Sequence, residues 1–337
     1  MDQKEYILMS TRRPKIDDVA KLAQVSKSTV SRVLNNRGYL SQNTIEKVYQ
    51  AIEELNYRPN TIARQLYSNK TNIIGLIFPT VNNPFYAEMV EALEKKLFNR
   101  GFKVILGNSM NDPHKEETYL LQLLSHQVDG LIVGAHNQDL KEYQKKNLPP
   151  IVAIDMNLNP EIPVVSSDNY QGGKIATQLL LKSGAKEIIH INGPASVKSP
   201  AQKRRQAYED VLKENNLIPH TYTVSLKDSK SKKIQIFREI FREHPLVDGI
   251  FASSDINAAL IIQIAKQLGI KVPDDLKVIG YDGANITRLL MPDLTSIIQP
   301  VETMSQKAVD ILQKMINDEP YPRNIILPVE LWKGTTA

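Results

Sequence analysis

The spacing of apolar residues predicts a group of short helices near the start of the chain. Apolar side chains recur three or four positions apart in three successive groups: Val19, Leu22 and Ala23; Val30, Val33 and Leu34; Ile45, Val48, Ile52 and Leu55. Asp17 and Asp18 fall in the first turn of the first helix, where the helix dipole favours negative charge, and Ser26 can cap the second helix. The pattern therefore predicts a helix-turn-helix, followed by a third helix that begins at Ser41 and ends before Tyr57.

A different rhythm begins at Asn72, where short runs rich in β-branched residues alternate with amphipathic segments. The expected strands are 73–78, 102–106, 130–133, 151–154, 188–191, 222–226, 247–251 and 276–279. The expected helices are 85–100, 114–126, 139–147, 172–183, 201–215, 231–243 and 255–268. This alternation is typical of parallel sheets, and its two series predict two α/β lobes whose ligands bind at the carboxyl ends of the strands.

A chain of 337 residues is too long for one core and suggests roughly two or three domains. The stretch between the two patterns is too short to hold a helix in water, so we expect it to order only on binding. The predicted domains are a helix-turn-helix head (1–59), a hinge (60–70) and a two-lobed α/β body (71–337).

The excess positive charge lies entirely in the first fifth of the chain. Residues 1–70 carry twelve Lys and Arg against seven Asp and Glu, whereas the rest balances at thirty of each, and the whole chain is net +5. A positive field confined to a small helical domain favours nucleic acid, because Lys and Arg displace counterions condensed on phosphates. The alternative is an ordinary solvated basic face.

Composition excludes several other classes of protein. The chain has no Cys, and its six His are scattered without a pair at metal-ligand spacing, so we expect no metal and no cofactor. Neither a phosphate-binding Gly-rich loop nor a Gly-x-Ser-x-Gly motif occurs. No apolar run approaches the roughly 18 residues needed to span a bilayer, and a signal-peptide core is missing, so we expect a cytoplasmic protein.

Polar and aromatic residues near predicted strand ends are the candidates for a ligand cleft. They are Phe85, Tyr86, His136, Asp168, Arg204, Asp255, Asp282 and Gln299. Carboxylates and amides can bond sugar hydroxyls, an Arg fork can span adjacent oxygens, and an aromatic ring can cover an apolar sugar face. The simpler alternatives stay open: Asp168 can cap the helix that contains Gly172, Asp282 can form a turn, and Arg204 can be surface charge beside Arg205.

Several motifs resemble those of the lactose/galactose-repressor family, in the family's order and over nearly the whole chain. In the head they are Asp18-Val19-Ala20, Val25-Ser26, Thr29-Val30-Ser31-Arg32-Val33, Asn56-Tyr57-Arg58-Pro59-Asn60 and Ala63-Arg64-Gln65-Leu66. In the body they are Asn83-Pro84-Phe85-Tyr86, Asp129-Gly130-Leu131-Ile132, Asp168-Asn169-Tyr170-Gln171-Gly172-Gly173, Gly280-Tyr281-Asp282 and Gln299-Pro300. Within the family, the chain is most similar to sucrose-operon-type repressors of Gram-positive bacteria.

The resemblance implies which head residues meet DNA. They are Ser26, Lys27, Ser28, Thr29, Arg32, Asn35 and Tyr39 in the helical head, and Asn60, Ala63 and Leu66 in the hinge. Lys27, Ser28 and Arg32 would read the major groove, and Leu66 would wedge into the minor groove from paired hinge helices. Lys15 departs from the family, because it stands where a capping Thr is usual.

For the body, the resemblance implies a periplasmic-binding-protein-like sensor. The family's effector residues match at Phe85, Asp168, Arg204, Asp282 and Gln299, and more loosely at Asp255. The chain would cross between lobes near 166–168, 298–299 and 327–328, so that lobe one holds about 71–167 and 300–327 and lobe two about 168–299. An aromatic residue that the family usually has before the helix at about 230 is missing here.

The expected function is a homodimeric repressor that binds operator DNA and responds to a small sugar or sugar phosphate. One alternative is a regulator that needs a phosphoprotein or another corepressor. A second alternative is a sugar-active enzyme with Asp168 and Asp282 as its acid/base pair. A transport-type binding protein fits less well, since no export signal precedes the body.

Overall fold

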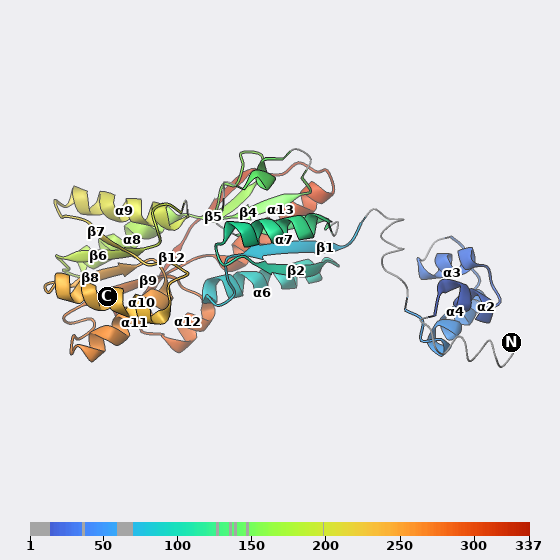
Figure 1. Cartoon of the computed structure of the whole chain (residues 1–337), viewed down its shortest axis with the longest axis horizontal. Coiled ribbons are helices and arrows are strands. Elements are labelled where there is room, and N and C mark those ends of the chain that lie inside the picture. Colours follow the sequence, from blue (N-terminus) through green and yellow to red (C-terminus); the bar gives the residue numbers. More distant parts are fainter. Residues whose placement is uncertain are drawn as a thin grey trace. The chain divides into compact units, whose positions relative to one another are not determined.

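The computed structural model divides the chain into two compact units, Met1–Lys70 and Thr71–Ala337 (Figure 1). The structure describes residues 14–35, 38–58, 70–125, 128–134, 137, 140–145, 148–197 and 199–337. The predicted DNA-contacting residues Asn60, Ala63 and Leu66, and the predicted cleft residue His136, lie outside these ranges.

The first unit contains the three predicted helices, α2 (Ile16–Leu22), α3 (Lys27–Leu34) and α4 (Gln42–Glu54). The Ser26 hydroxyl caps α3 by accepting from the Thr29 N–H at 3.1 Å, and Ser41 caps α4 in the same way. Val19, Val30, Val33, Val48 and Tyr57 lie in the shared core, which confirms the apolar pattern.

Helix α2 begins in spite of the departure at Lys15. The Lys15 side chain cannot accept a hydrogen bond, so it cannot cap the helix as Thr would. Instead the Lys15 backbone N–H donates to the Asp18 carboxylate at 2.7 Å. This contact fixes the chain before the helix, and Asp18 also places negative charge in the first turn.

The second unit holds two sheets, each of six strands among the described residues. Sheet A is parallel and has the order β11-β5-β4-β3-β1-β2, and sheet B has the order β12-β10-β9-β8-β6-β7, with only β12 antiparallel. The strands of sheet A are β1 (Ile73–Phe78), β2 (Lys103–Asn108), β3 (Gly130–Val133), β4 (Ile151–Ile154), β5 (Val164–Ser167) and β11 (Asn324–Leu327). Those of sheet B are β6 (Ile188–Asn192), β7 (His220–Thr223), β8 (Gly249–Ala252), β9 (Lys277–Asp282), β10 (Thr295–Ile298) and β12 (Glu330–Trp332).

Helices cover both faces of each sheet and complete the two lobes (Figure 1). Lobe one consists of sheet A with α6 (Pro84–Phe98), α7 (Pro113–Ser125) and α13 (Val301–Ile316). Lobe two consists of sheet B with α8 (Asn169–Lys182), α9 (Ala201–Glu214), α10 (Lys230–Glu243), α11 (Asp255–Gln267) and α12 (Asn285–Leu290). The chain passes between the sheets after β5, after β10 and after β11, so these three segments join the lobes.

The structure corrects two of the predicted elements and adds others. Where a helix was expected over 139–147, the described residues form only a 3-10 turn, Lys141–Gln144. Pro149 and Pro150 follow closely and favour extended backbone before them. The strand expected at 222–226 ends at Thr223, because the Asp228 carboxylate draws the Ser225 N–H into a turn at 2.8 Å. The pattern also missed β5, β10, β11, β12, α12 and α13.

Candidate DNA-reading and effector sites

The outer face of α3 presents most of the residues predicted to contact DNA. Ser26, Lys27, Ser28, Arg32 and Asn35 are exposed, and Thr29 is half-buried. Beyond the helix, Tyr39 is 95% exposed. Because Val30 and Val33 hold the opposite face in the core, this polar face is directed outward on a fixed support.

Local contacts position the longer side chains of that face. The Arg32 guanidinium donates to the Tyr39 carbonyl at 3.4 Å, and the Asn35 amide donates to the Ser31 carbonyl at 2.8 Å. Gly38 has φ +73°, and a Cβ there would lie 2.5 Å from Arg32 Nη2. Glycine at this turn therefore adopts the left-handed backbone without strain and leaves room for the Arg32 guanidinium.

Serine and lysine at the start of α3 have structural partners too. The Ser26 hydroxyl lies 2.7 Å from that of Ser28 and 2.8 Å from that of Thr29. The Lys27 ammonium pairs with Asp17 at 3.1 Å, and both side chains are more than half exposed. An ion pair so exposed is weak, so Lys27 can exchange Asp17 for a phosphate.

In the second unit, Arg204 is the centre of a buried polar cluster. Its Nε donates to Asn169 Oδ1 at 2.7 Å, and its Nη1 donates to the Ser253 carbonyl at 2.8 Å. Nη1 also lies 3.9 Å from Asp282 Oδ1, and the guanidinium carbon stands 3.5 Å from the centroid of the Tyr281 ring. Arg204 is only 6% exposed, so the alternative interpretation of Arg204 as an ordinary surface charge beside Arg205 is wrong.

Asp282 and Gln299 connect this cluster to the segments that join the lobes. Gln299 Nε2 donates to Asp282 Oδ1 at 2.9 Å, and its Oε1 accepts from the Ser167 hydroxyl at 2.7 Å. Ser167 ends β5 of lobe one, whereas Asp282 ends β9 of lobe two. Asp282 has φ +109°, a conformation that is costly for a residue other than glycine and is concentrated at functional sites.

The structure gives Asp255 and Asp168 well-defined structural partners. Asp255 is buried and accepts from the Gly283 N–H at 2.8 Å and from the Ser296 hydroxyl at 2.5 Å, which ties the turn after β9 to β10. Asp168 caps α8 by accepting from the Gln171 N–H at 2.9 Å. A contact of either carboxylate with an effector stays a prediction.

Phe85 and Tyr86 lie at the start of α6. Phe85 is buried, and its ring meets that of Tyr86 edge-on with centroids 5.2 Å apart. Burial raises the pKa of Tyr86, and the negative charges of Asp282 and Asp155 raise it further. Tyr86 is therefore close enough to the cluster to sense its charge.

The carboxyl groups of the cluster hold their protons more tightly than usual. Burial raises the pKa of Asp282 to about 6, although Arg204 opposes the shift. Burial, reinforced by Asp282, raises the pKa of Asp255 to about 8, and burial also raises the pKa of Asp155. At neutral pH, a pKa of about 6 leaves Asp282 mostly ionised beside Arg204, whereas a pKa of about 8 leaves Asp255 mostly protonated.

Sequence reasoning missed several members of the cluster. Asp155 Oδ1 accepts from the Ser167 N–H at 3.0 Å and from Asn169 Nδ2 at 3.3 Å. Two of the missed residues, Asn169 and Tyr281, stand within motifs that resemble those of the family, and Ser167 directly precedes Asp168. Their place in the sequence was therefore an available signal. Asp155 follows β4 in a left-handed conformation, φ +62°, which the sequence pattern does not reveal.

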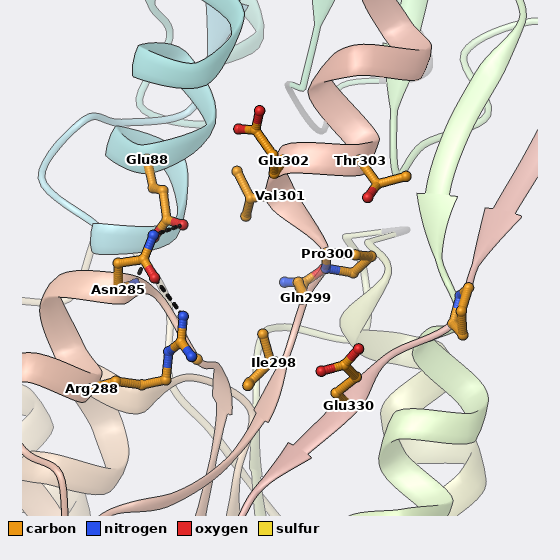
Figure 2. A pocket seen from close by; sticks show the side chains of 12 residues that line it. Glu88, Asn285, Arg288, Ile298, Gln299, Pro300, Val301, Glu302, Thr303 and Glu330 are labelled. Carbon is orange, nitrogen blue, oxygen red and sulfur yellow. Dashed lines mark hydrogen bonds between the residues drawn. The ribbon is translucent and has the colours of Figure 1, made fainter.

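A pocket of about 280 Å³ lies beside the cluster, between the lobes (Figure 2). Gly283 and Gln299 line it together with Glu88 of lobe one and Arg288 of lobe two. The Glu88 carboxylate accepts from the Asn285 N–H at 2.7 Å and from the Asn285 side-chain amide at 2.8 Å. These bonds join α6 to α12 directly.

Comparison with known families identifies the class of protein. Residues 15–60 match the model for bacterial regulatory proteins of the lacI family, and residues 71–335 match the model for periplasmic binding proteins and the sugar binding domain of the LacI family. The chain therefore belongs to the LacI family of DNA-binding repressors with a sugar-binding domain.

Among its relatives are sucrose operon repressors. The one from Pediococcus pentosaceus is 45% identical over 96% of this chain and 100% of the relative, and the one from Streptococcus mutans is 43% identical over 96% and 99%. Among solved structures, the lac repressor dimer bound to operator and the anti-inducer ONPF has a TM-score of 0.85 and 26% identity, covering 96% of this chain and 99% of that one. Because the family is one of regulators, the enzyme alternative is not supported.

Within the described ranges, no helix combines the length and the apolar character that crossing a membrane requires. In the same ranges, no three His, Cys, Asp or Glu side chains are grouped so that they could hold a metal ion.

Proposed function

We propose that this protein is a homodimeric repressor of a carbohydrate-utilisation operon of the sucrose type, acting on operator DNA in the cytoplasm. A sugar bound at the Arg204 cluster lowers its affinity for the operator. The similarity to sucrose operon repressors supports the sucrose-type role, and the lac repressor dimer on its operator supports the assembly.

The observation that carries the proposal is the hydrogen-bonded path between the lobes. It runs from Ser167 through Gln299 to Asp282, beside Arg204. A ligand that exchanges bonds with these groups acts on both lobes at once. It can shift the conformational equilibrium only as far as its affinities for the two arrangements differ.

The charge of the cluster favours an uncharged sugar over a sugar phosphate. A phosphate group would bring up to two negative charges toward Asp282, which is ionised above its pKa of about 6, and would compete with Asn169, Ser253 and Asp282 for the Arg204 guanidinium. Hydroxyl groups instead donate to carboxylates, and charge-assisted bonds of this kind are the strong ones. We therefore propose a neutral, hydroxyl-rich effector.

The head reads the operator through the exposed face of α3. Arg32 and Lys27 supply charge, and Ser28 and Asn35 supply short polar groups that reach base edges in a major groove. In a homodimer, two such faces would bind two half-sites about one helical turn apart.

The test is operator binding by the full chain with and without sugar. A high-affinity duplex is first selected from a random library, and fluorescence anisotropy then follows its binding in sucrose, fructose, glucose or their phosphates. We expect an unphosphorylated sugar to weaken operator binding by roughly 5–150-fold, the usual range of allosteric coupling. Operator affinity unaffected by any of them would overturn the sensor role, while loss of all DNA binding would overturn the repressor role.

A further inference from the structure

Asn192 lies at the edge of sheet B where the Arg204 cluster is built. It is the last residue of β6, and the pairing of Ile191 with Ala252 places it beside Ser253. The Ser253 carbonyl is one of the acceptors of Arg204. Asn192 is therefore at the carboxyl end of a strand inside the sheet, where ligands of parallel sheets bind, and it is only 1% exposed.

Neighbouring hydrogen bonds fix the orientation of the Asn192 amide. Gln202 Nε2 donates to the carbonyls of Pro194 and Val197 at 3.0 and 3.3 Å, so Gln202 Oε1 must be its free acceptor. Asn192 Nδ2 faces that oxygen at 3.4 Å. A reversed Asn192 amide would place two acceptor oxygens against each other, which excludes the flipped form.

The fixed orientation leaves Asn192 Oδ1 buried and without a hydrogen-bond partner among the described residues. Arg204 Nε and Nη1, Asp282 Oδ1 and both amide atoms of Gln299 have partners, whereas the buried Tyr281 hydroxyl is, like Asn192 Oδ1, without one among the described residues. Buried acceptors are rarely left unpaired, because losing water without gaining a partner is costly. An unpaired acceptor at a ligand-binding edge indicates a donor that arrives from outside the chain.

Space is available immediately beside this residue. A Cβ added to Gly193 would meet no atom within 4 Å, and Gly193 does not have the left-handed φ that would itself require glycine. By contrast, a Cβ on Gly172 or Gly173, in the nearby helix α8, would come within 2.4 or 2.6 Å of another atom. The backbone next to Asn192 is thus open to a small group.

We propose that Asn192 is a further effector-binding residue, whose Oδ1 accepts a hydrogen bond from one hydroxyl of the sugar, and that Gly193 leaves room for that part of the ligand. This inference rests on the proposed sensor function and adds a specificity contact to it. A sugar that lacks the hydroxyl facing Asn192 loses this hydrogen bond and therefore binds more weakly.

The first experiment compares Asn192→Ala with Thr221→Val. Thr221 Oγ1 is also buried and unpartnered, but it lies on β7 opposite His190, two residues before the end of β6. Calorimetry on the full chain, with sucrose, fructose and glucose as separate probes, should show sugar affinity reduced about tenfold in Asn192→Ala, which is ~1.4 kcal/mol. Thr221→Val should bind the sugar as the unaltered chain does.

A second variant separates ligand binding from a structural role, because Asn192 also contacts Gln202. Gly193→Ala removes no contact and adds one methyl group to open space. We expect its thermal unfolding midpoint and its operator affinity without sugar to stay unchanged, while its sugar affinity falls at least fivefold. Equal sugar affinity in Gly193→Ala and the unaltered chain would contradict the proposed position of the ligand.

Deoxy analogues of the bound sugar identify the hydroxyl. For one of them, Asn192→Ala and the unaltered chain should bind equally, since the bond is already absent. If Asn192→Ala binds sugar with normal affinity, the inference is wrong but the sensor function stands. If neither the three sugars nor their phosphates bind the unaltered chain, the sensor function fails, and this inference fails with it.

Discussion

Asp282→Asn is the most informative substitution in the candidate effector site. Asp282 is buried, and its Oδ1 accepts from Gln299 and lies 3.9 Å from Arg204. Its φ of +109° makes alanine a poor choice, because Ala is strained there, whereas Asn tolerates positive φ better and keeps the side-chain shape. The substitution therefore removes the negative charge with little change to the backbone.

The expected magnitude follows from the lost charge. A hydrogen bond to a charged group contributes about 1.5–3 kcal/mol and a neutral one about 0.5–1.5 kcal/mol. The difference of about 1–1.5 kcal/mol predicts sugar affinity roughly tenfold lower for Asp282→Asn at pH 7.5, where the carboxyl is ionised. Because the pKa of Asp282 is about 6, the two proteins should converge as the pH falls below 6 and the native carboxyl is protonated.

Calorimetric titration with the effector sugar at pH 7.5 and 5 measures both effects. Asp129→Asn is the matched control. Asp129 is a structural carboxylate that accepts from Thr71 and Asn72 at the amino ends of the strands of sheet A, whereas ligands bind at the carboxyl ends. Operator binding without sugar should be normal in both variants, so Asp282→Asn represses but responds poorly. Unchanged sugar affinity at pH 7.5 would refute a role for the Asp282 charge in the site.

Three further predictions concern the head, the hinge and the stability of the body. Arg32→Ala should lower operator affinity about 5- to 150-fold in anisotropy assays, since a bidentate base contact is worth about 1–3 kcal/mol. An unchanged circular-dichroism melt is expected because Arg32 is exposed, and normal operator affinity would exclude Arg32 from the interface. Leu66→Ala should reduce the preference for operator over random duplex while non-specific binding persists; equal losses on both would contradict a minor-groove wedge. Because Asp255 has a pKa of about 8 in the fold against about 3.9 unfolded, the folded body binds its proton more tightly, so the thermal midpoint should fall as pH rises from 4 to 8. Asp255→Asn should flatten that slope, and an equally steep slope in the variant would assign the effect to other groups.

The fold could be predicted largely from periodicity. The helical spacing of the head and the strand-helix alternation of the body each reflect one apolar face packed on a core. The exceptions are short elements decided by tertiary contacts. The 3-10 turn at Lys141–Gln144 buries Tyr143, whose hydroxyl donates to Glu116 at 2.8 Å, and no local pattern marks that long-range bond.

The cluster could be predicted only in part. Motifs marked Arg204, Asp282 and Gln299, and Asp282 and Gln299 also stand at the ends of strands; the structure does bring the three together. Asp155 and Asn192 also follow predicted strands, at 151–154 and 188–191, but no candidate list included them, and only the order of strands within the two sheets shows which strand ends lie together. A sequence shows which residues end strands, but the strand order decides which ends are neighbours.

The central claim is that sugar binding between the lobes and operator binding by the head are coupled. Coupling is reciprocal, so the sugar must bind the operator-bound protein more weakly by the same factor by which it weakens operator binding. Titrating the sugar into the free chain and into the chain saturated with operator duplex measures this directly. We predict sugar affinities that differ roughly 5–150-fold between the two titrations, whereas identical affinities would contradict the account.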